Sequence, residues 1–141
     1  MLCNVSYNNS DIKESIDELV GKSFSFRERL KLGGTGSPKL KIQEASVEIS
    51  SLLNLENSIN YCNIELRPRG IIVSFRSILE TYAWVVPYYR LSTFKSHDTW
   101  SFYSGEEHLK LRNSLGFSSV SDFFIKMQNL KSESYTDITS V

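Results

Sequence analysis

The chain has 141 residues, of which 40% are hydrophobic and 23% are charged. This length matches one domain with a core of its own, and the hydrophobic content excludes disorder over most of the chain. Sixteen lysines and arginines balance sixteen aspartates and glutamates. The net basic charge that is typical of a dedicated nucleic-acid binder is therefore missing.

Cysteine usage and the N-terminus point to a cytoplasmic chain. Two cysteines, Cys3 and Cys62, and two histidines are too few for a disulfide framework or a structural metal site. The first residues lack the basic start and apolar run of a signal peptide, and the apolar run 83–86 is too short to span a membrane. We expect reduced thiols, no cofactor, no metal and no transmembrane segment.

The first helix is expected after a flexible leader. Residues 1–9 are polar and show no pattern. Asp11 and Glu14 then fit a capping box, the following apolar residues share one helical face, and Gly21 stands where a C-cap belongs. The sequence therefore predicts a helix that ends at Val20 and presents an acidic outer face.

A basic strand is expected next. From Ser23 to Leu32 apolar and polar residues alternate, which predicts a half-buried strand. Its inward face carries Phe24, Phe26, Leu30 and Leu32, and its outward face carries Arg27, Arg29 and Lys31. A glycine-rich loop leads to a second strand, 40–49, whose apolar phase slips at Gln43 and Glu44 as it does at a β-bulge. Residues 50–59 fit either a short helical turn or an irregular crossover.

Short strands dominate the middle of the chain. The apolar runs predict a hairpin around the turn 67–70, a strand that ends in a corner at Pro87, a second hairpin and one more strand. The expected strands are 61–66, 71–75, 81–86, 91–95, 100–103 and 108–112.

A second helix is expected at the end of the pattern. Ser119 and Asp122 make a capping pair, and residues 132–141 form a frayed tail. The apolar stripe of this helix consists of Val120, Phe123, Phe124, Met127 and Leu130. Together these elements predict a mostly β, α+β domain over residues 10–131. It is an antiparallel barrel or sandwich of about seven or eight strands, with an N-terminal helix and a C-terminal helix that covers its opening.

The segments 64–66, 70–73 and 82–91 resemble bacterial pleckstrin-homology-like domains, in which a hairpin precedes an aliphatic strand and a Pro-Tyr corner. The final helix is similar to the capping helix of that family, so the resemblance covers about residues 60–131. An added N-terminal helix and the segment 23–49 depart from it. The resemblance implies a binding module without catalytic activity.

The candidates for chemistry favour structural roles. Cys62 alternates with apolar neighbours in a strand, and nothing local would lower its pKa. The pair His97 and Asp98 is typical of a turn. Glu106, Glu107 and His108 are consecutive in the chain, so alternation along a strand separates them. We predict no catalytic and no metal-ligating residues.

The basic strand face is the main candidate for binding. Arg27, Arg29 and Lys31 share it, and Arg67 and Arg69 at the first hairpin tip extend it. A solvated strand with protective edge charges is the alternative interpretation. Most aromatic rings are expected in the core, whereas an exposed Trp84 or Trp100 would anchor a partner.

These observations favour a non-enzymatic binding module that acts through protein–protein contacts or self-association. A binder of anionic lipid or nucleic acid is the alternative, followed by a small enzyme whose site the spacing does not reveal.

Overall fold

Eight antiparallel strands form one sheet in the computed structural model, which describes residues 1–53, 59–113 and 117–139. Their order across the sheet is β1-β5-β4-β3-β2-β8-β7-β6. The strands are β1 (Leu2–Asn4), β2 (Leu40–Ala45), β3 (Tyr61–Arg67), β4 (Gly70–Ser77), β5 (Glu80–Pro87), β6 (Ser92–Ser96), β7 (Thr99–Ser104) and β8 (Glu107–Asn113). The helices are α1 (Ser10–Val20), α2 (Phe26–Leu32), α3 (Val47–Leu52), the 3₁₀ turn η1 (Tyr88–Arg90) and α4 (Phe117–Thr139).

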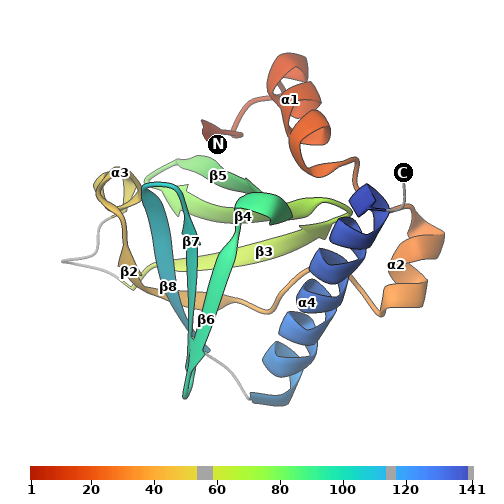
Figure 1. The fold of residues 1–141 in the computed structure, drawn as a ribbon. Coiled ribbons are helices and arrows are strands. Elements are labelled where there is room, and N and C mark those ends of the chain that lie inside the picture. The colour runs from red at the N-terminus through yellow and green to blue at the C-terminus, as the bar shows by residue number, and fades with distance from the viewer. Residues whose placement is uncertain (54–58, 114–116, 140–141) are drawn as a thin grey trace.

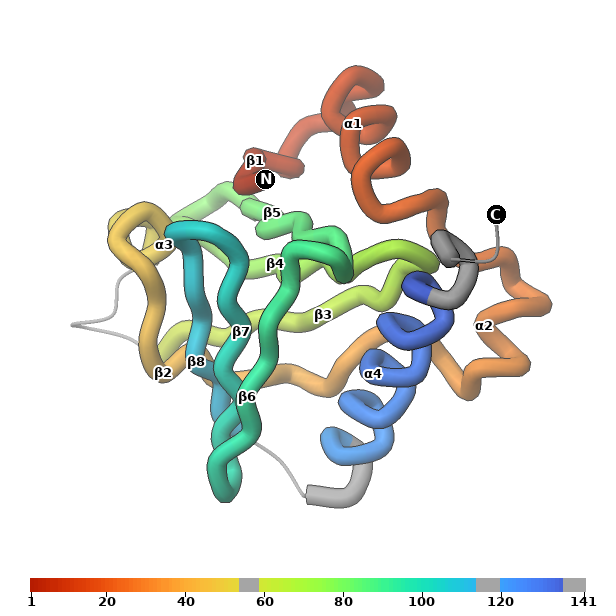
Figure 2. The backbone as a smooth tube through the Cα atoms, viewed as in Figure 1, coloured from red at the N-terminus to blue at the C-terminus, as the bar shows by residue number. Residues whose placement is uncertain are grey.

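The sheet is open, with β1 and β6 at its two edges. It confirms the expected mostly β, α+β fold with an N-terminal and a C-terminal helix, but it does not close into a barrel. Helix α4 lies against the inner face of the bent sheet, as Figures 1 and 2 show. The helix therefore covers a sheet face and does not plug a barrel end.

Both predicted hairpins are confirmed. β3 and β4 pair from Cys62↔Phe75 to Arg67↔Gly70, and β6 and β7 pair from Ser92↔Tyr103 to Ser96↔Thr99. In each case two residues connect the strands, as the turn chemistry predicts. The predicted corner after β5 is the 3₁₀ turn that begins at Tyr88.

Strand β2 contains the predicted bulge. Its register against β8 shifts between Ile42 and Glu44, and a bulge of this kind bends a strand. The strand ends at Ala45, however, and Val47–Leu52 form α3. The expectation of a strand as far as Ile49 is therefore wrong. Of the segment 50–59, the structure shows a helical turn to Leu52, while residues 54–58 lie outside the described residues.

Two details of the N-terminal region differ from expectation. Residues 2–4 are not a loose leader but an edge strand, with Leu2 opposite Trp84. Helix α1 is capped by Asn9, whose side-chain oxygen accepts hydrogen bonds from the backbone N–H groups of Asp11 and Ile12. An N-cap asparagine satisfies the same unpaired donors as the capping box that we expected at Asp11 and Glu14. The predicted C-cap at Gly21 is confirmed.

The segment after α1 is the largest departure, because the predicted strand 23–32 is helix α2. Ser25 and Glu28 form a reciprocal capping box, and Gly33 closes the helix in the left-handed conformation with φ 74°. These local signals outweigh the alternation of apolar residues, because a capping box satisfies two helix N–H groups that otherwise lack partners. Figure 1 shows α2 standing beside α4 rather than in the sheet.

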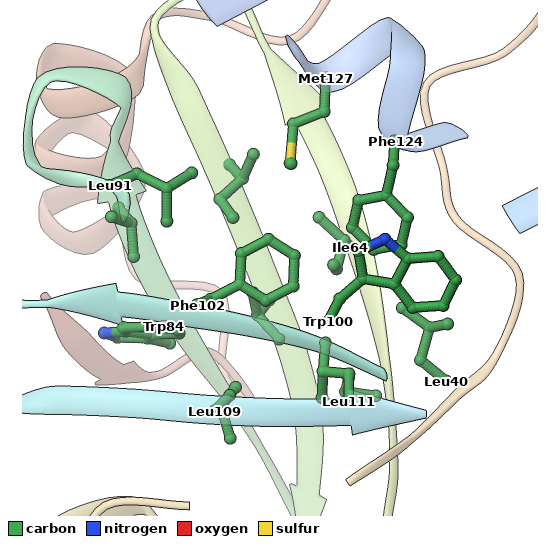
Figure 3. Packing of buried hydrophobic residues seen from close by; sticks show 14 of the residues in the cluster. Leu40, Ile64, Trp84, Leu91, Trp100, Phe102, Leu109, Leu111, Phe124 and Met127 are labelled. Atoms are coloured by element: carbon green, nitrogen blue, oxygen red, sulfur yellow. The ribbon is translucent and has the colours of Figure 1, made fainter. Parts of the chain in front are cut away.

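The core has two parts because β4 and β5 are covered on both faces. The larger part fills the space between the inner face of the sheet and α4 (Figure 3). The smaller part joins α1 to the outer face through Ile16, Val20, Ile72, Ala83 and Val85. The apolar character of both faces of the segment 81–86 thus follows from its central position between two helices.

Helix α4 carries the predicted apolar stripe into the core, where Val120, Phe123, Phe124, Met127 and Leu130 are all buried. It begins at Phe117, before the expected cap at Ser119, and continues to Thr139. The predicted frayed tail from residue 132 is therefore mostly helical.

The β4–β5 hairpin ends in two exposed apolar residues. Ile78 is 92% exposed and Leu79 is 84% exposed. Ile78 has a φ of 58°, a left-handed conformation that costs an ordinary L-residue about 1–2 kcal/mol and that β-branched residues avoid. Glycine or asparagine would serve this turn better, so folding alone does not account for isoleucine here.

Candidate functional site

The three cations predicted on one strand face lie on α2. Arg27, Arg29 and Lys31 are exposed, and the Arg29 Nε donates a hydrogen bond to the Phe24 carbonyl. Their spacing places them around a single short helix, so they do not form a flat row across a sheet. The predicted basic strand face is therefore wrong in its geometry, although the charges are accessible.

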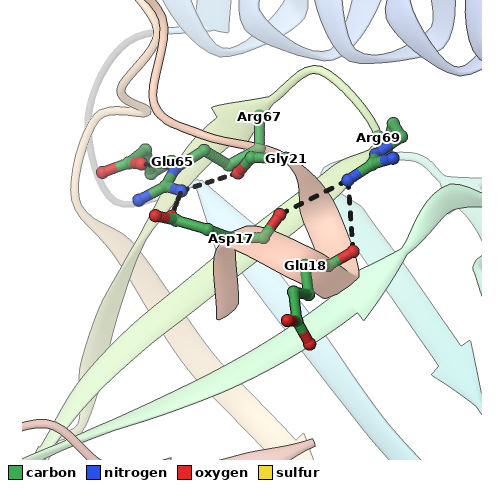
Figure 4. A network of polar contacts seen from close by, with 6 residues as sticks. All are labelled: Asp17, Glu18, Gly21, Glu65, Arg67 and Arg69. Atoms are coloured by element: carbon green, nitrogen blue, oxygen red, sulfur yellow. Dashed lines mark hydrogen bonds and ion pairs between the residues drawn. The ribbon is translucent and has the colours of Figure 1, made fainter. Parts of the chain in front are cut away.

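Arg67 and Arg69 hold α1 against the first hairpin rather than extending a basic surface (Figure 4). The Arg67 Nη1 lies 3.0 Å from the Asp17 carboxylate and 2.8 Å from the Gly21 carbonyl oxygen, and its Nε pairs with Glu65. The Arg69 Nη2 donates to the Glu18 carbonyl at 3.1 Å. Cations at these last carbonyls offset the negative end of the helix dipole.

Neither tryptophan is an exposed anchor. Trp84 is 1% exposed and lies in the main core. Trp100 is 6% exposed and stacks on Phe124, with 4.6 Å between ring centroids. Trp100 does, however, form part of the floor of a groove that opens to solvent, and Figure 3 shows its indole beside Phe124 of α4.

This groove runs between the edge strand β6 and helix α4, and we call it the α4–β6 groove. Its volume is about 420 Å³. One wall is β6, from Thr93 to Lys95, and the floor is Trp100 with Met127. The other wall is a row of α4 side chains at helical spacing: Ser121, Phe124, Ile125 and Gln128.

A side-chain hydrogen bond joins the two walls of the groove. The Gln128 Nε2 donates a hydrogen bond to the Thr93 Oγ1 at 2.9 Å. Ile125 is 59% exposed, so a large apolar side chain stands at the rim. The Lys95 ammonium lies 5.7 Å from the centre of the Trp100 ring. The groove therefore combines an apolar floor with one cation at its edge.

Strand β6 offers unpaired backbone groups along this groove. Among the described residues it pairs with β7 alone. A two-residue hairpin loop is closed by a hydrogen-bonded pair, here Ser96 and Thr99, and bonded and non-bonded pairs then alternate along the ladder. Thr93 and Lys95 fall on the non-bonded positions. Their N–H and C=O groups thus point away from β7, toward the open edge.

Several of the residues considered for catalysis are buried or have structural partners in the described part of the chain. Burial raises the pKa of the Cys62 thiol to about 12, so this thiol is un-ionised near neutral pH and is a poor nucleophile. Asp98 pairs with Arg112 at 2.9 Å, and the His108 ring stacks on Tyr103. Within the described parts of the chain, no group of three or more histidine, cysteine or carboxylate side chains could hold a metal ion.

Sequence reasoning missed the groove, although it named Trp100 and Phe124. One signal was present: Ile125 lies off the buried stripe of α4 and is nonetheless a large apolar residue. The sequence contains no comparable signal that β6 lies at an open edge, because the order of strands in a sheet depends on pairing between distant segments.

Comparisons with family models, curated proteins and solved structures find no match to this chain. In the part of the chain that the structure describes, no helix is long and apolar enough to cross a membrane.

Proposed function

We propose that this protein is a non-enzymatic binding module whose partner is an extended peptide segment of another protein. The α4–β6 groove carries this proposal, because an unpaired strand edge lies beside an apolar floor. In this mode of recognition an added strand gains affinity from main-chain hydrogen bonds, and pockets for its alternate side chains give specificity.

The chemistry of the groove defines the segment that fits it. Backbone groups of Thr93 and Lys95 pair with the incoming strand. An apolar side chain of that strand rests on Trp100 between β6 and Ile125. A carboxylate near this position faces the Lys95 ammonium, which favours acidic over basic segments.

We also propose that the chain is a pleckstrin-homology-like domain. What supports it is the order of the elements: antiparallel hairpins followed by a C-terminal helix that packs on the sheet. The peptide groove lies between that helix and an edge strand. The proposal does not depend on the class, since the groove is defined by its own residues.

Of the binding residues predicted from the sequence, the cations of α2 have weaker support as a site. Arg67 and Arg69 are engaged with α1, and the remaining three cations, Arg27, Arg29 and Lys31, are exposed on α2. Three cations spread around a short exposed helix offer an anion little shape to recognise. An anion site on α2 is accordingly the second candidate.

The test begins with selection of peptides from a random library on the full-length chain. Titration of a selected peptide should shift the backbone amide resonances of Thr93, Lys95 and Ile125. Ile125→Asp should weaken binding at least about tenfold, because it places a charge on the apolar rim. Phe26→Asp, on an exposed apolar residue of α2, is the matched control and should bind normally.

A second pair of variants separates backbone pairing from charge. Lys95→Pro removes an outward N–H group and should abolish binding, whereas Lys95→Ala keeps that group and should bind with only a modest loss. Equal losses in both variants, with intact folding by circular dichroism, would show that strand addition to β6 is wrong. Resonance shifts confined to α2 would support the second candidate instead.

A further inference from the structure

A second surface lies on the outer face of the sheet, away from the α4–β6 groove. A cleft of about 330 Å³ opens where β3, β4 and β5 meet. Two cations, Lys39 and Arg76, line it. The other side chains of this cleft that face outward are Tyr61, Asn63, Ser74 and Thr81. Among the described residues, no carboxylate contributes to its lining. We call it the basic cleft.

The basic cleft is built as a donor-rich site. The Lys39 ammonium sits 4.4 Å from the centre of the Tyr61 ring, which fixes the cation at the wall of the cleft. Arg76 is exposed on β4. Hydroxyl and amide groups between them supply further hydrogen-bond donors. An anionic group with several acceptor oxygens matches this lining.

Two carboxylates near the cleft in the sequence, Glu80 and Glu65, are engaged with other residues. Glu80 alternates with Thr81, so its side chain lies on the opposite face of β5. There it accepts a hydrogen bond from the Asn4 Nδ2 at 2.6 Å. Glu65, on the outer face of β3, is paired with Arg67. Both carboxylates are therefore engaged with partners that do not line the cleft.

The exposed hairpin tip adjoins this cleft directly. Arg76 and Thr81 are cross-strand partners, and only the pair Ser77↔Glu80 separates them from the turn. The turn itself carries Ile78 and Leu79, which are 92% and 84% exposed. Figures 1 and 2 place this end of β4 and β5 far from α2. A cationic cleft and two protruding aliphatic side chains thus share one end of the sheet.

We propose that this end of the molecule docks on an anionic lipid bilayer, with Ile78 and Leu79 inserted among the acyl chains and a phosphate-bearing headgroup in the basic cleft. The two features act together, because interfacial binding combines buried apolar area with attraction to anionic lipid. The strained backbone of Ile78 supports this role, since an apolar residue is kept where the turn favours glycine or asparagine. A cationic cleft alone would be sufficient to bind a soluble anion, but it would not account for the exposed aliphatic side chains of Ile78 and Leu79.

The first measurement is sedimentation of the full chain with vesicles. Vesicles of phosphatidylcholine with about 30% phosphatidylserine should retain the protein, and those of phosphatidylcholine alone should retain far less. Added salt should weaken retention. The double variant Ile78→Asn, Leu79→Asn should lose binding at least about tenfold while its melting temperature stays the same or rises. Phe26→Asn removes an exposed apolar side chain from α2 and should bind as the wild type does.

A second set of variants tests the electrostatic contribution. Arg76→Gln should weaken retention on anionic vesicles about fivefold. Arg27→Gln is the matched control and should leave retention unchanged. Leu79→Trp should show a blue-shifted emission with the anionic vesicles, which reports insertion. Soluble glycerophosphoserine should not compete, because it lacks the acyl chains.

Three results would overturn the proposal. The wild type could fail to bind anionic vesicles, or the tip variant could bind as well as the wild type. Full competition by glycerophosphoserine would make the cleft a site for a soluble anion. Each of these outcomes leaves peptide binding in the α4–β6 groove untouched, since the two surfaces share no residue.

Discussion

Trp100 of β7 stacks on Phe124 of α4 with the two ring planes 13° apart, and this contact fastens the C-terminal helix to the sheet. Phe124 also meets Phe102 and Phe123. We expect Phe124→Ala to lower the free energy of unfolding by about 3–5 kcal/mol, because it leaves a cavity at the centre of an aromatic cluster. Urea denaturation of the full chain measures this change.

The neighbouring residue gives the control for that experiment. Ile125→Ala removes an exposed side chain and should change stability by less than about 0.5 kcal/mol. A loss below about 1 kcal/mol in Phe124→Ala would show that α4 is not packed on the sheet as described.

At Gly70 the first hairpin and α1 approach each other closely. A Cβ atom at this glycine would overlap the Val20 Cγ1 and the Val86 carbonyl oxygen, and it would lie 2.8 Å from the Pro87 Cα. Because two of these atoms are backbone, a side-chain movement cannot relieve the overlap. We expect Gly70→Ala to cost about 3 kcal/mol in thermal or chemical unfolding.

Gly36 provides the comparison, because nothing lies within 4 Å of a Cβ atom added there. Gly36→Ala should be neutral or slightly stabilising, since it reduces the entropy of the unfolded chain. Similar behaviour of the two variants would contradict the close approach of α1 to the hairpin.

The sequence alone predicted what depends on local chemistry. The turn 67–70, the bulge near Glu44 and the buried stripe of α4 are each encoded in a few consecutive residues, and all are confirmed. The prediction for the segment 23–32 was wrong because two signals conflict over this short span. The alternation of apolar residues predicts a strand, whereas a capping box predicts a helix. Here the box between Ser25 and Glu28 was the stronger signal.

What could not be predicted depends on contacts between distant segments. The pairing of β1 with β5 joins residues about eighty positions apart. The open edge of β6 follows from the order of the whole sheet. The role of Arg67 likewise required knowing that α1 lies across the hairpin tip. Residue spacing within one segment carries no information on such placements.

Burial of Cys62 makes stability depend on pH in the alkaline range. Its pKa is about 12 in the folded chain, against an ordinary value of 9.0 for an exposed thiol. Between these values the unfolded chain releases a proton that the folded chain keeps, so ionisation favours unfolding. The free energy of unfolding should fall by about 1.4 kcal/mol per pH unit from this residue as pH rises above 9. Below pH 9 this thiol adds no pH dependence.

Cys62→Ala isolates this effect. The variant should be less stable at pH 8, because a buried sulfur is lost, but its alkaline slope should be shallower than that of the wild type. Burial also raises the pKa of Tyr88, so some decline above pH 10 remains in both proteins. Identical slopes from pH 9 to 11 would show that Cys62 is not buried.

Arg67 and the cations of α2 should respond differently to substitution. Arg67 has a side chain that is 13% exposed and is bonded to Asp17 and to Gly21. Arg67→Gln should lower stability by about 2 kcal/mol, because the Asp17 carboxylate loses its partner and a helix-end carbonyl loses its donor. Limited proteolysis should show earlier cleavage around α1.

Replacing Arg27, Arg29 and Lys31 together by serine should leave stability within about 1 kcal/mol of the wild type, because all three side chains are exposed. Their removal tests the second candidate function at the same time, since an anion site on α2 would lose most of its affinity and its salt dependence. Heparin retention at low and moderate salt measures this loss. A large drop in melting temperature would show that these charges hold α2 in place. Unchanged heparin retention, with stability intact, would exclude α2 as the anion-binding surface and leave the basic cleft beside Ile78 as the surface to test.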